Sequence, residues 1–257
     1  MTHPAGASGE APGEVPGQPE TTDPETMDIE TTDPETIDIE TPVGMARVLL
    51  YRPTPDRPAG ALVLGHGAGG GVGAVDLVAV MSAALAAGWQ VALVEQPWKV
   101  AGRKVAAPPG RLDVAWTAVV TALSGRGSVA GRGSLSGSRV LGGPLVLGGR
   151  SAGARVACRT AGALGAAAVC CLAFPLHPPG RPERSRADEL AACPVPVLVV
   201  QGRKDAFGTA QEVAGLAEPR VEVVEVDGDH SLKADPAAVG QAVAAWLAGR
   251  SYAGRMT

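Results

Sequence analysis

The feature that most constrains the fold of this chain is a serine that stands between two glycines directly after an apolar run. Residues 145–149 read LVLGG, Ser151 follows Arg150, and an alanine-rich segment with helical periodicity starts at once. A strand that passes into a helix through Gly-x-Ser-x-Gly makes a turn with room for only tiny residues beside the serine. Gly149 and Gly153 meet this demand. The turn would raise the hydroxyl above a helix N-terminus, whose free N–H groups favour negative charge.

Strand and helix patterns alternate from residue 42 onward. Apolar runs predict strands at 45–51, 61–64, 90–95, 145–147, 167–174, 196–201 and 221–226. Helical patterns occupy 76–87, 112–123, 152–164, 211–217 and 236–248. Buried strands that are each followed by a helix indicate an α/β fold, with a mostly parallel central sheet and helices on both faces. Ligands bind beyond the carboxyl ends of such strands.

Length and composition indicate one globular domain with a tail. The chain has 257 residues, 46% hydrophobic and only 3% aromatic, so aliphatic side chains must build the core. The sequence has neither an 18-residue apolar run nor a secretory start. We therefore expect a cytoplasmic monomer or homodimer that does not contact membranes. Neither a metal nor another cofactor is expected, because zinc-site spacing is lacking and buried reduced thiols are predicted at Cys158, Cys170, Cys171 and Cys193.

The N-terminal segment differs from the rest of the chain in charge. The first 40 residues carry 11 of the 26 acidic side chains and no Lys or Arg. Residues 21–30 and 31–40 read TTDPETMDIE and TTDPETIDIE, a repeat with one substitution. We expect residues 1–41 to be a disordered acidic tail, because so little apolar surface cannot offset the ordering entropy. An acidic arm that covers the basic core or binds a partner is the alternative.

The predicted domain spans residues 42–250 and is basic. With 22 basic and 15 acidic side chains, the chain beyond residue 40 has a net charge of +7. A Gly/Ser/Arg-rich stretch at 124–139 is expected to be a flexible insertion, and 251–257 a C-terminal tail. No nucleic-acid partner is expected, since the arginines are scattered and not interleaved with aromatic residues.

A serine nucleophile needs an adjacent base. His230 lies between the last predicted strand and the last predicted helix, so a site with Ser151 would have the chain order Ser…Asp…His; a surface histidine is the alternative. Asp205 follows the strand at 196–201 and could accept the imidazole proton, or else cap the next helix. Asp227 and Asp229 are rival carboxylates, but both lie very close to His230 in sequence.

The oxyanion of a tetrahedral intermediate needs two hydrogen-bond donors. The backbone N–H groups of Ala152 and Ala68 are the candidates. Ala68 lies in the loop HGAGGG at 66–71, whose glycines permit a close approach of the backbone. A phosphate-binding loop is the rival interpretation, but no Gly-Lys-Ser/Thr follows. His66 is expected to hold this loop in shape, and the candidate substrate-binding residues are His66, Gly67, Arg150 and His177.

Six sequence blocks resemble one family. They are 64–69 (LGHGAG), 95–98 (EQPW), 148–155 (GGRSAGAR), 174–180 (FPLHPPG), 201–208 (QGRKDAFG) and 227–231 (DGDHS). Together they resemble the small dienelactone-hydrolase-like α/β-hydrolases, which include bacterial hydrolases and the animal testis-expressed and NSL-complex-subunit homologues. The resemblance covers residues 42–250 and implies an eight-stranded hydrolase sheet with Ser151, Asp205 and His230 as a triad. The chain departs from it at Arg150, often lysine, and at Ala152, often methionine.

These residues predict a serine hydrolase that cleaves a small ester or thioester through an acyl-enzyme. The proline-rich segment 175–186 is too short for a lid domain, so a minimal lid and an open site are expected. Arg150, Arg103 and Arg111 could favour an anionic substrate, or could be ordinary solvated arginines. The alternative function is a non-catalytic binding or scaffold protein on a hydrolase fold. A separation above about 4 Å between His230 and Ser151 would favour that alternative.

Overall fold

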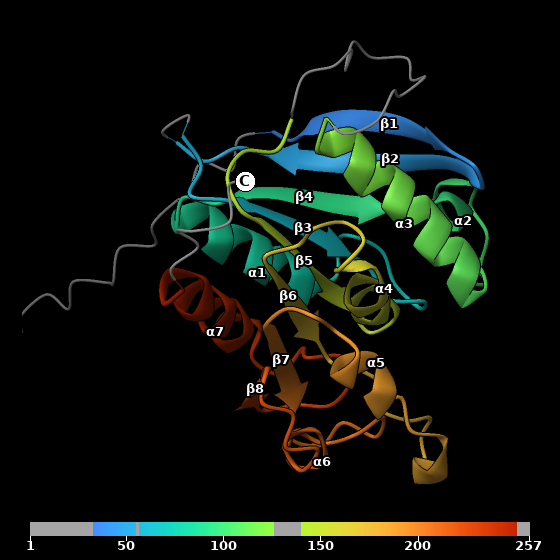
Figure 1. Ribbon diagram of the computed structural model, residues 1–257, viewed down its shortest axis with the longest axis vertical. Helices are drawn as coiled ribbons and strands as arrows, with labels where there is room; N and C mark the ends of the chain where they lie inside the picture. The colour runs from blue at the N-terminus through green and yellow to red at the C-terminus, as the bar shows by residue number, and fades with distance from the viewer. Residues whose placement is uncertain (1–32, 55–56, 126–139, 251–257) are drawn as a thin grey trace, which may run out of the picture. The chain divides into compact units, whose positions relative to one another are not determined.

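The computed structural model describes residues 33–54, 57–125 and 140–250 (Figure 1). These residues belong to one compact unit. Most of the expected acidic tail, residues 126–139 of the expected insertion and the C-terminal tail at 251–257 lie outside the described residues. None of the helices within the described ranges is long and apolar enough to cross a membrane.

The described residues form an eight-stranded sheet with the order β1-β2-β4-β3-β5-β6-β7-β8. β2 is antiparallel to both of its neighbours, and every other pair is parallel. All seven strands predicted from the sequence are present, with ends shifted by three residues at most. The strands are β1 (Glu35–Thr41), β2 (Gly44–Tyr51), β3 (Ala61–Gly65), β4 (Gln90–Glu95), β5 (Leu145–Arg150), β6 (Ala168–Leu172), β7 (Val197–Gly202) and β8 (Val221–Val226).

The edge strand β1 corrects the predicted extent of the tail. Residues 35–41 were expected to be disordered, but they pair with β2 as an antiparallel hairpin. The alternating side chains Ile37 and Ile39 are 7% and 1% exposed and face the core. A tight turn closes this hairpin, where the Thr41 hydroxyl donates to the Gly44 carbonyl at 2.6 Å. Because the turn between β1 and β2 is short, their pairing costs little loop-closure entropy. Composition alone does not reveal this effect.

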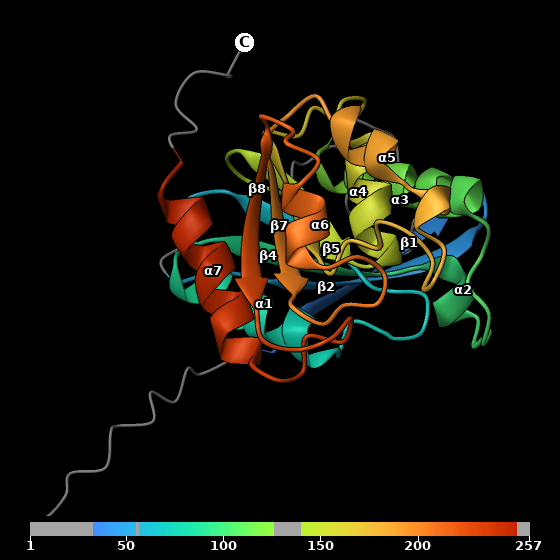
Figure 2. The ribbon, with the colours of Figure 1, turned by 90° about the horizontal axis from the view of Figure 1, so that it is seen from below.

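Helices cover both faces of the sheet (Figure 2). One face carries α1 (Val75–Ala86) and α7 (Pro236–Ala248), and the other carries α3 (Pro109–Leu123) and α4 (Ala152–Thr160). All five predicted helices are present, but those expected at 152–164 and 211–217 end early, at Thr160 and Ala214. The shorter helices are α2 (Pro97–Val100), η1 (Pro182–Arg184), α5 (Ala187–Ala191) and α6 (Ala210–Ala214).

The sheet separates two largely aliphatic cores. On the α1/α7 face, Leu77, Val80 and Val243 are fully buried against alternate side chains of the strands. On the α3/α4 face, Trp116 and Val119 are likewise fully buried. Each such side chain contributes about 1.5–3 kcal/mol by leaving water. Because both faces are covered, the central strands β3, β6 and β7 are buried at every residue and show no polar alternation, as predicted.

The point where the strand order reverses positions the candidate site. From β3 the chain passes to β4 on one side, and then returns to β5 on the other side. The loops that leave β3 and β5 therefore diverge at their carboxyl ends and open a crevice between them. The loop at 66–71 leaves β3 here, and Ser151 follows β5.

Three glycines bring β3 against the turn that carries Ser151. A Cβ added to Gly149 or to Gly153 would lie 2.4 Å from the Gly65 carbonyl oxygen. Gly149 also has φ +153°, which L side chains rarely adopt. The β5–α4 turn is consequently seated directly on β3, with no space for a methyl group.

We predict that Gly153→Ala destabilises the protein by about 2 kcal/mol or more, because the methyl group overpacks the contact with Gly65. Gly110→Ala is the matched control. Gly110 is also the second residue of its helix, but a Cβ there meets nothing within 4 Å. Urea denaturation of both variants checks this. Equal stability of the two would contradict the close contact.

All four cysteines are free and buried, as expected from the sequence. The Sγ atoms of Cys158 and Cys171 lie 3.5 Å apart. Burial raises the pKa of the Cys170 thiol to about 12 and also raises that of Cys171. The reactive thiolate form is therefore scarce at neutral pH.

We predict that none of the four thiols reacts with Ellman's reagent at pH 8 in the native protein, and that all four react in denaturant. A thiol stays protonated at a pH below its raised pKa, so little thiolate is present at pH 8. Burial also keeps the reagent away from the sulfur atoms. Absorbance of the released thionitrobenzoate gives the count. A thiol that reacts quickly without denaturant would contradict the burial.

Candidate active site

Ser151 occupies the turn between β5 and α4, as the motif predicted. Its backbone has φ 52° and ψ −107°, an unfavourable conformation for a residue with a side chain. Its N–H donates to the Leu172 carbonyl at 2.9 Å, which anchors the turn to β6. Gly67 packs against the turn, where an added Cβ would lie 3.4 Å from the Ser151 Cβ. The strained turn thus presents the hydroxyl beside the loop that leaves β3.

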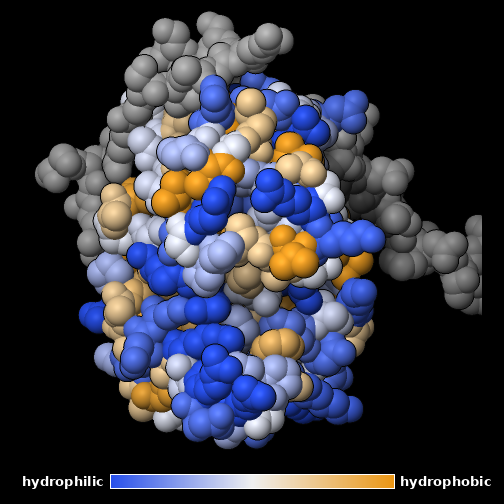
Figure 3. All heavy atoms as spheres, turned by 90° about the vertical axis from the view of Figure 1, so that its right-hand side faces the viewer, coloured by the Kyte–Doolittle hydropathy of each residue, from blue (hydrophilic) through white to orange (hydrophobic). Residues whose placement is uncertain are grey.

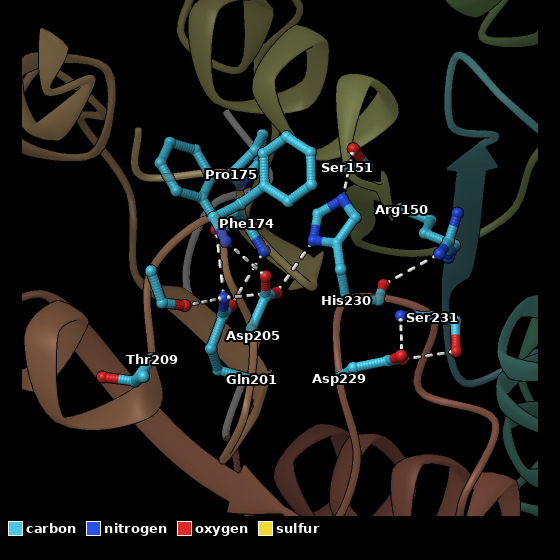
Figure 4. A network of polar contacts seen from close by, with 12 residues as sticks. Arg150, Ser151, Phe174, Pro175, Gln201, Asp205, Thr209, Asp229, His230 and Ser231 are labelled. Carbon is cyan, nitrogen blue, oxygen red and sulfur yellow. Dashed lines mark hydrogen bonds and ion pairs between the residues drawn. The ribbon is translucent and has the colours of Figure 1, made fainter. Parts of the chain in front are cut away.

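His230 and Asp205 lie next to Ser151, although 79 and 54 residues separate them from it along the chain (Figure 4). The His230 Nε2 is 2.9 Å from the Ser151 Oγ. The His230 Nδ1 is 2.8 Å from the Asp205 Oδ2. An ionised carboxylate only accepts hydrogen bonds, so Nδ1 carries the proton and Nε2 is free to accept from the serine hydroxyl. This is the arrangement of a nucleophile with its base and an orienting carboxylate.

The Asp205 carboxylate is fully buried and has a partner on each oxygen. Oδ1 accepts from the Phe207 N–H at 2.8 Å, and Oδ2 accepts from the Gln201 amide at 2.9 Å as well as from His230. These bonds compensate the cost of burying a charge. The rival carboxylates point elsewhere. Asp229 accepts from the Ser231 N–H and hydroxyl, and Asp227 lies near Arg203 with 70% of its side chain exposed.

Two residues beside Asp205 and His230, Gln201 and Phe207, were not assigned a role from the sequence. Gln201 is the second-last residue of β7 and bonds to Phe174 N, Phe174 O, Gly208 O and Asp205, so its amide links four backbone and side-chain atoms (Figure 4). The Phe207 ring lies 4.1 Å from the His230 ring, centroid to centroid. The signal for Gln201 was a polar residue ending a continuous apolar strand. No sequence signal distinguishes Phe207 from an ordinary core residue.

The loop after β3 is held by His66. This ring is 3% exposed, and burial lowers its pKa, which favours the neutral form. Its Nε2 accepts from the Gln96 N–H at 3.1 Å, and its Nδ1 lies 2.9 Å from the Gly67 carbonyl oxygen. The expectation that His66 shapes the loop therefore has geometric support. Both ring nitrogens are engaged, so a direct polar contact with substrate is not supported.

The two proposed oxyanion donors lie on one pocket. Ala68 and Ala152 both line it, together with Gly67, Trp98 and Val156. Ala152 is the first residue of α4, so its N–H is among those that the helix itself leaves without a partner. The N-terminus of α4, which is the positive end of the helix dipole, therefore borders this pocket.

Arg150, a candidate substrate-binding residue from the sequence, is paired within the protein. Its Nε lies 2.9 Å from the Asp76 Oδ2, and its Nη2 donates to the His230 carbonyl at 2.8 Å. Asp76 is fully buried in the first turn of α1. Burial raises the pKa of its carboxyl, an effect that Arg150 opposes. Arg150 thus ties the loop of His230 to α1. The sequence pattern did not reveal Asp76 as its partner.

His177, another candidate substrate-binding residue, is likewise paired within the protein. Its Nδ1 lies 3.0 Å from the Pro178 carbonyl oxygen and its Nε2 lies 3.2 Å from the Glu212 Oε1. The Pro178 carbonyl raises the pKa of this imidazole, and Glu212 adds to the shift. The ring consequently joins the 175–186 segment to α6. Its assignment to substrate binding is not supported by these contacts.

The sheet order, the strained serine turn and the helices on both faces define an α/β-hydrolase fold with a minimal lid. The chain belongs to the alpha/beta hydrolase domain family, whose model matches residues 58–248. No curated protein matches the sequence.

Solved structures share this fold at low sequence identity. One is an alpha-beta serine hydrolase homologue from Coxiella burnetii, with 17% identity, a TM-score of 0.66, and coverage of 84% of this chain and 98% of that one. Another, from Xanthomonas campestris, is an α/β serine hydrolase without a lid, with 20% identity, a TM-score of 0.61 and coverage of 86% and 98%. Est1E from Butyrivibrio proteoclasticus has 14% identity, a TM-score of 0.64 and coverage of 83% and 97%.

We predict that Arg150→Gln increases amide hydrogen exchange in the loop 227–232 by about tenfold, because the loop loses a hydrogen bond from a charged donor. Arg155→Gln is the matched control. Arg155 is also half-buried and paired, with Glu189 at 2.5 Å, but this partner lies in α5 and not in the loop 227–232. Exchange is read by mass spectrometry. Equal exchange of this loop in both variants would show that Arg150 does not hold it.

Proposed function

We propose that this protein is a serine hydrolase that cleaves a small carboxylic ester or thioester through an acyl-enzyme. The observation that carries the proposal is the continuous contact from Asp205 through His230 to Ser151, at 2.8 and 2.9 Å. Distances in this range permit proton transfer without rearrangement. The esterase and serine hydrolase names of structural neighbours agree with this reaction class. Membership of the dienelactone-hydrolase-like branch is part of the proposal and rests on the six sequence blocks.

In the first half-reaction, the Ser151 Oγ attacks the carbonyl carbon while the His230 Nε2 takes the hydroxyl proton. The carbonyl oxygen becomes an oxyanion, held by the N–H groups of Ala68 and Ala152. Asp205 keeps the Nδ1 proton in place and stabilises the imidazolium. His230 then gives its proton to the departing alcohol or thiol, and the acyl group stays on Ser151.

In the second half-reaction, water attacks the acyl-enzyme. His230 takes a proton from this water, the oxyanion forms again at the same donors, and its collapse breaks the bond to Ser151 Oγ. The proton on His230 returns to the serine, and the carboxylic acid leaves. No step requires a group other than water and the residues named.

The rival proposal, a non-catalytic binding protein, lacks a supporting feature at this site. A binding protein would be indicated by a separation above about 4 Å between His230 and Ser151. The observed distance between His230 Nε2 and Ser151 Oγ is 2.9 Å. The buried Asp205 carboxylate also has no need of His230 for packing alone, since Gln201 and the Phe207 N–H already bond to it.

We predict that a fluorophosphonate probe labels the wild-type protein and that Ser151→Ala abolishes the label. His230→Ala is expected to lower kcat on p-nitrophenyl acetate by about 10³-fold or more, because the nucleophile loses its base. Ser185→Ala is the matched control, since Ser185 is an exposed serine whose hydroxyl accepts from the Ala187 N–H at the start of α5. Its label should persist.

The readout is gel fluorescence, followed by kinetics on a panel of p-nitrophenyl esters and acyl-CoA thioesters. An unlabelled and inactive wild-type protein, beside a control esterase that labels, would overturn the proposal.

A further inference from the structure

A row of cations lies beside the proposed oxyanion site. A hollow next to the β3 loop is lined by Ala68, Gly69 and Trp98, and by three basic side chains, Lys99, Arg103 and Lys104, which are called its rim below. Ala68 and Trp98 also line the pocket that contains Ala152. The two hollows therefore share a wall, and the cations border the space where a substrate of Ser151 would extend.

The three rim side chains differ from most basic residues around the site in their pairing. Arg150 is paired with Asp76, Arg155 with Glu189, and Arg203 with Glu225. By contrast, Lys99, Arg103 and Lys104 form no ion pair with any residue that the structure describes. Their charge is thus available to a ligand.

The carboxylate of Glu95 lies near this rim but does not line the hollow. Glu95 ends β4 and lies near Lys99, since an added Cβ on Gly71 would be 3.4 Å from the Lys99 Cε and 4.0 Å from the Glu95 Oε1. However, Glu95 stands opposite Arg47 across the β2–β4 pair, and it does not line the hollow. The lining therefore carries three cations and no anion.

A second hollow extends the same positive surface. It is bounded by α2 and the start of α3, and it includes Arg103 and Arg111 together with Gln96 and Trp98. Between Glu95 and Asp113 the chain has four basic residues and no acidic one. Figure 3, which faces the α2 side of Figure 1, shows hydrophilic side chains interspersed with small hydrophobic patches. The net charge of the segment between Glu95 and Asp113 therefore has the same sign as that of the first hollow's lining.

We propose that the ester or thioester cleaved at Ser151 carries an anionic group, a carboxylate or a phosphate, which binds at Lys99, Arg103 and Lys104. This inference rests on the proposed hydrolase function and specifies its substrate class. Exposed cations attract such a group, and the attraction is modest because water and salt screen it. It raises the local concentration of the substrate and favours one orientation of it. Lys99 lies on α2 and is half-buried, so it is the most constrained of the three.

The test compares matched neutral and anionic esters on the purified full chain. In one arm the charge is on the acyl side, with p-nitrophenyl hydrogen succinate against p-nitrophenyl butyrate. In the other arm it is on the alcohol side, with 4-carboxyphenyl acetate against phenyl acetate. We expect the kcat/KM ratio of anionic to neutral ester to exceed about fivefold in one arm, and the arm identifies which side of the ester reaches the rim.

The variant Arg103→Gln with Lys104→Gln should reduce this ratio by about fivefold or more, as should raising the ionic strength from about 20 to 500 mM. Arg57→Gln with Arg220→Gln is the matched control. It removes the same charge at the amino ends of β3 and β8, the opposite edge of the sheet from the site. The control should retain the wild-type ratio.

The outcomes separate the two proposals. If no ester or thioester is cleaved and no probe labels Ser151, the hydrolase function itself fails. If esters are cleaved but neither arm prefers the anion, the cationic subsite is overturned while the hydrolase function stands. A preference that survives loss of Arg103 and Lys104, and also high salt, equally overturns the assignment of these residues.

Discussion

The contact between β3 and the turn after β5 is the constraint on which the rest of this structure depends. Gly149 and Gly153 both approach the Gly65 carbonyl so closely that a methyl group has no place. This contact fixes the direction in which Ser151 leaves the sheet and the distance from it to the loop at 66–71. The strained conformation of Ser151 is maintained because the turn is held by β3 on one side and by β6 on the other.

A buried carboxylate organises the opposite half of the site. Asp205 is removed from water, and such a charge is stable only when its oxygens accept hydrogen bonds. Gln201, the Phe207 N–H and His230 supply these bonds. The ring of His230 is also restrained, since Phe207 lies against it and Arg150 holds its carbonyl. The result is a preorganised imidazole whose free nitrogen faces the serine, which is the property that a general base requires.

Sequence patterns predicted the fold well because the apolar runs are continuous and the helices follow each strand. They failed at β1, since the segment TIDIE has the composition of a polar tail and becomes a strand only through its hairpin with β2. They also did not reveal the internal partners of Arg150 and His177, which were candidates for substrate binding. Both side chains are used internally, by Asp76 and by Glu212, and such long-range pairings leave no trace in local spacing.

The sequence by itself determined the strand–serine–helix turn and the chain order of Ser151, Asp205 and His230, because tight turns and buried strands impose local residue choices. Only the tertiary structure decided which carboxylate faces the imidazole, since Asp227 and Asp229 lie near His230 along the chain and Asp205 follows the neighbouring strand β7. It also decided which basic side chains remain available near Ala68. Pairing of charges depends on distances across the folded molecule, and the order of residues does not encode those distances directly.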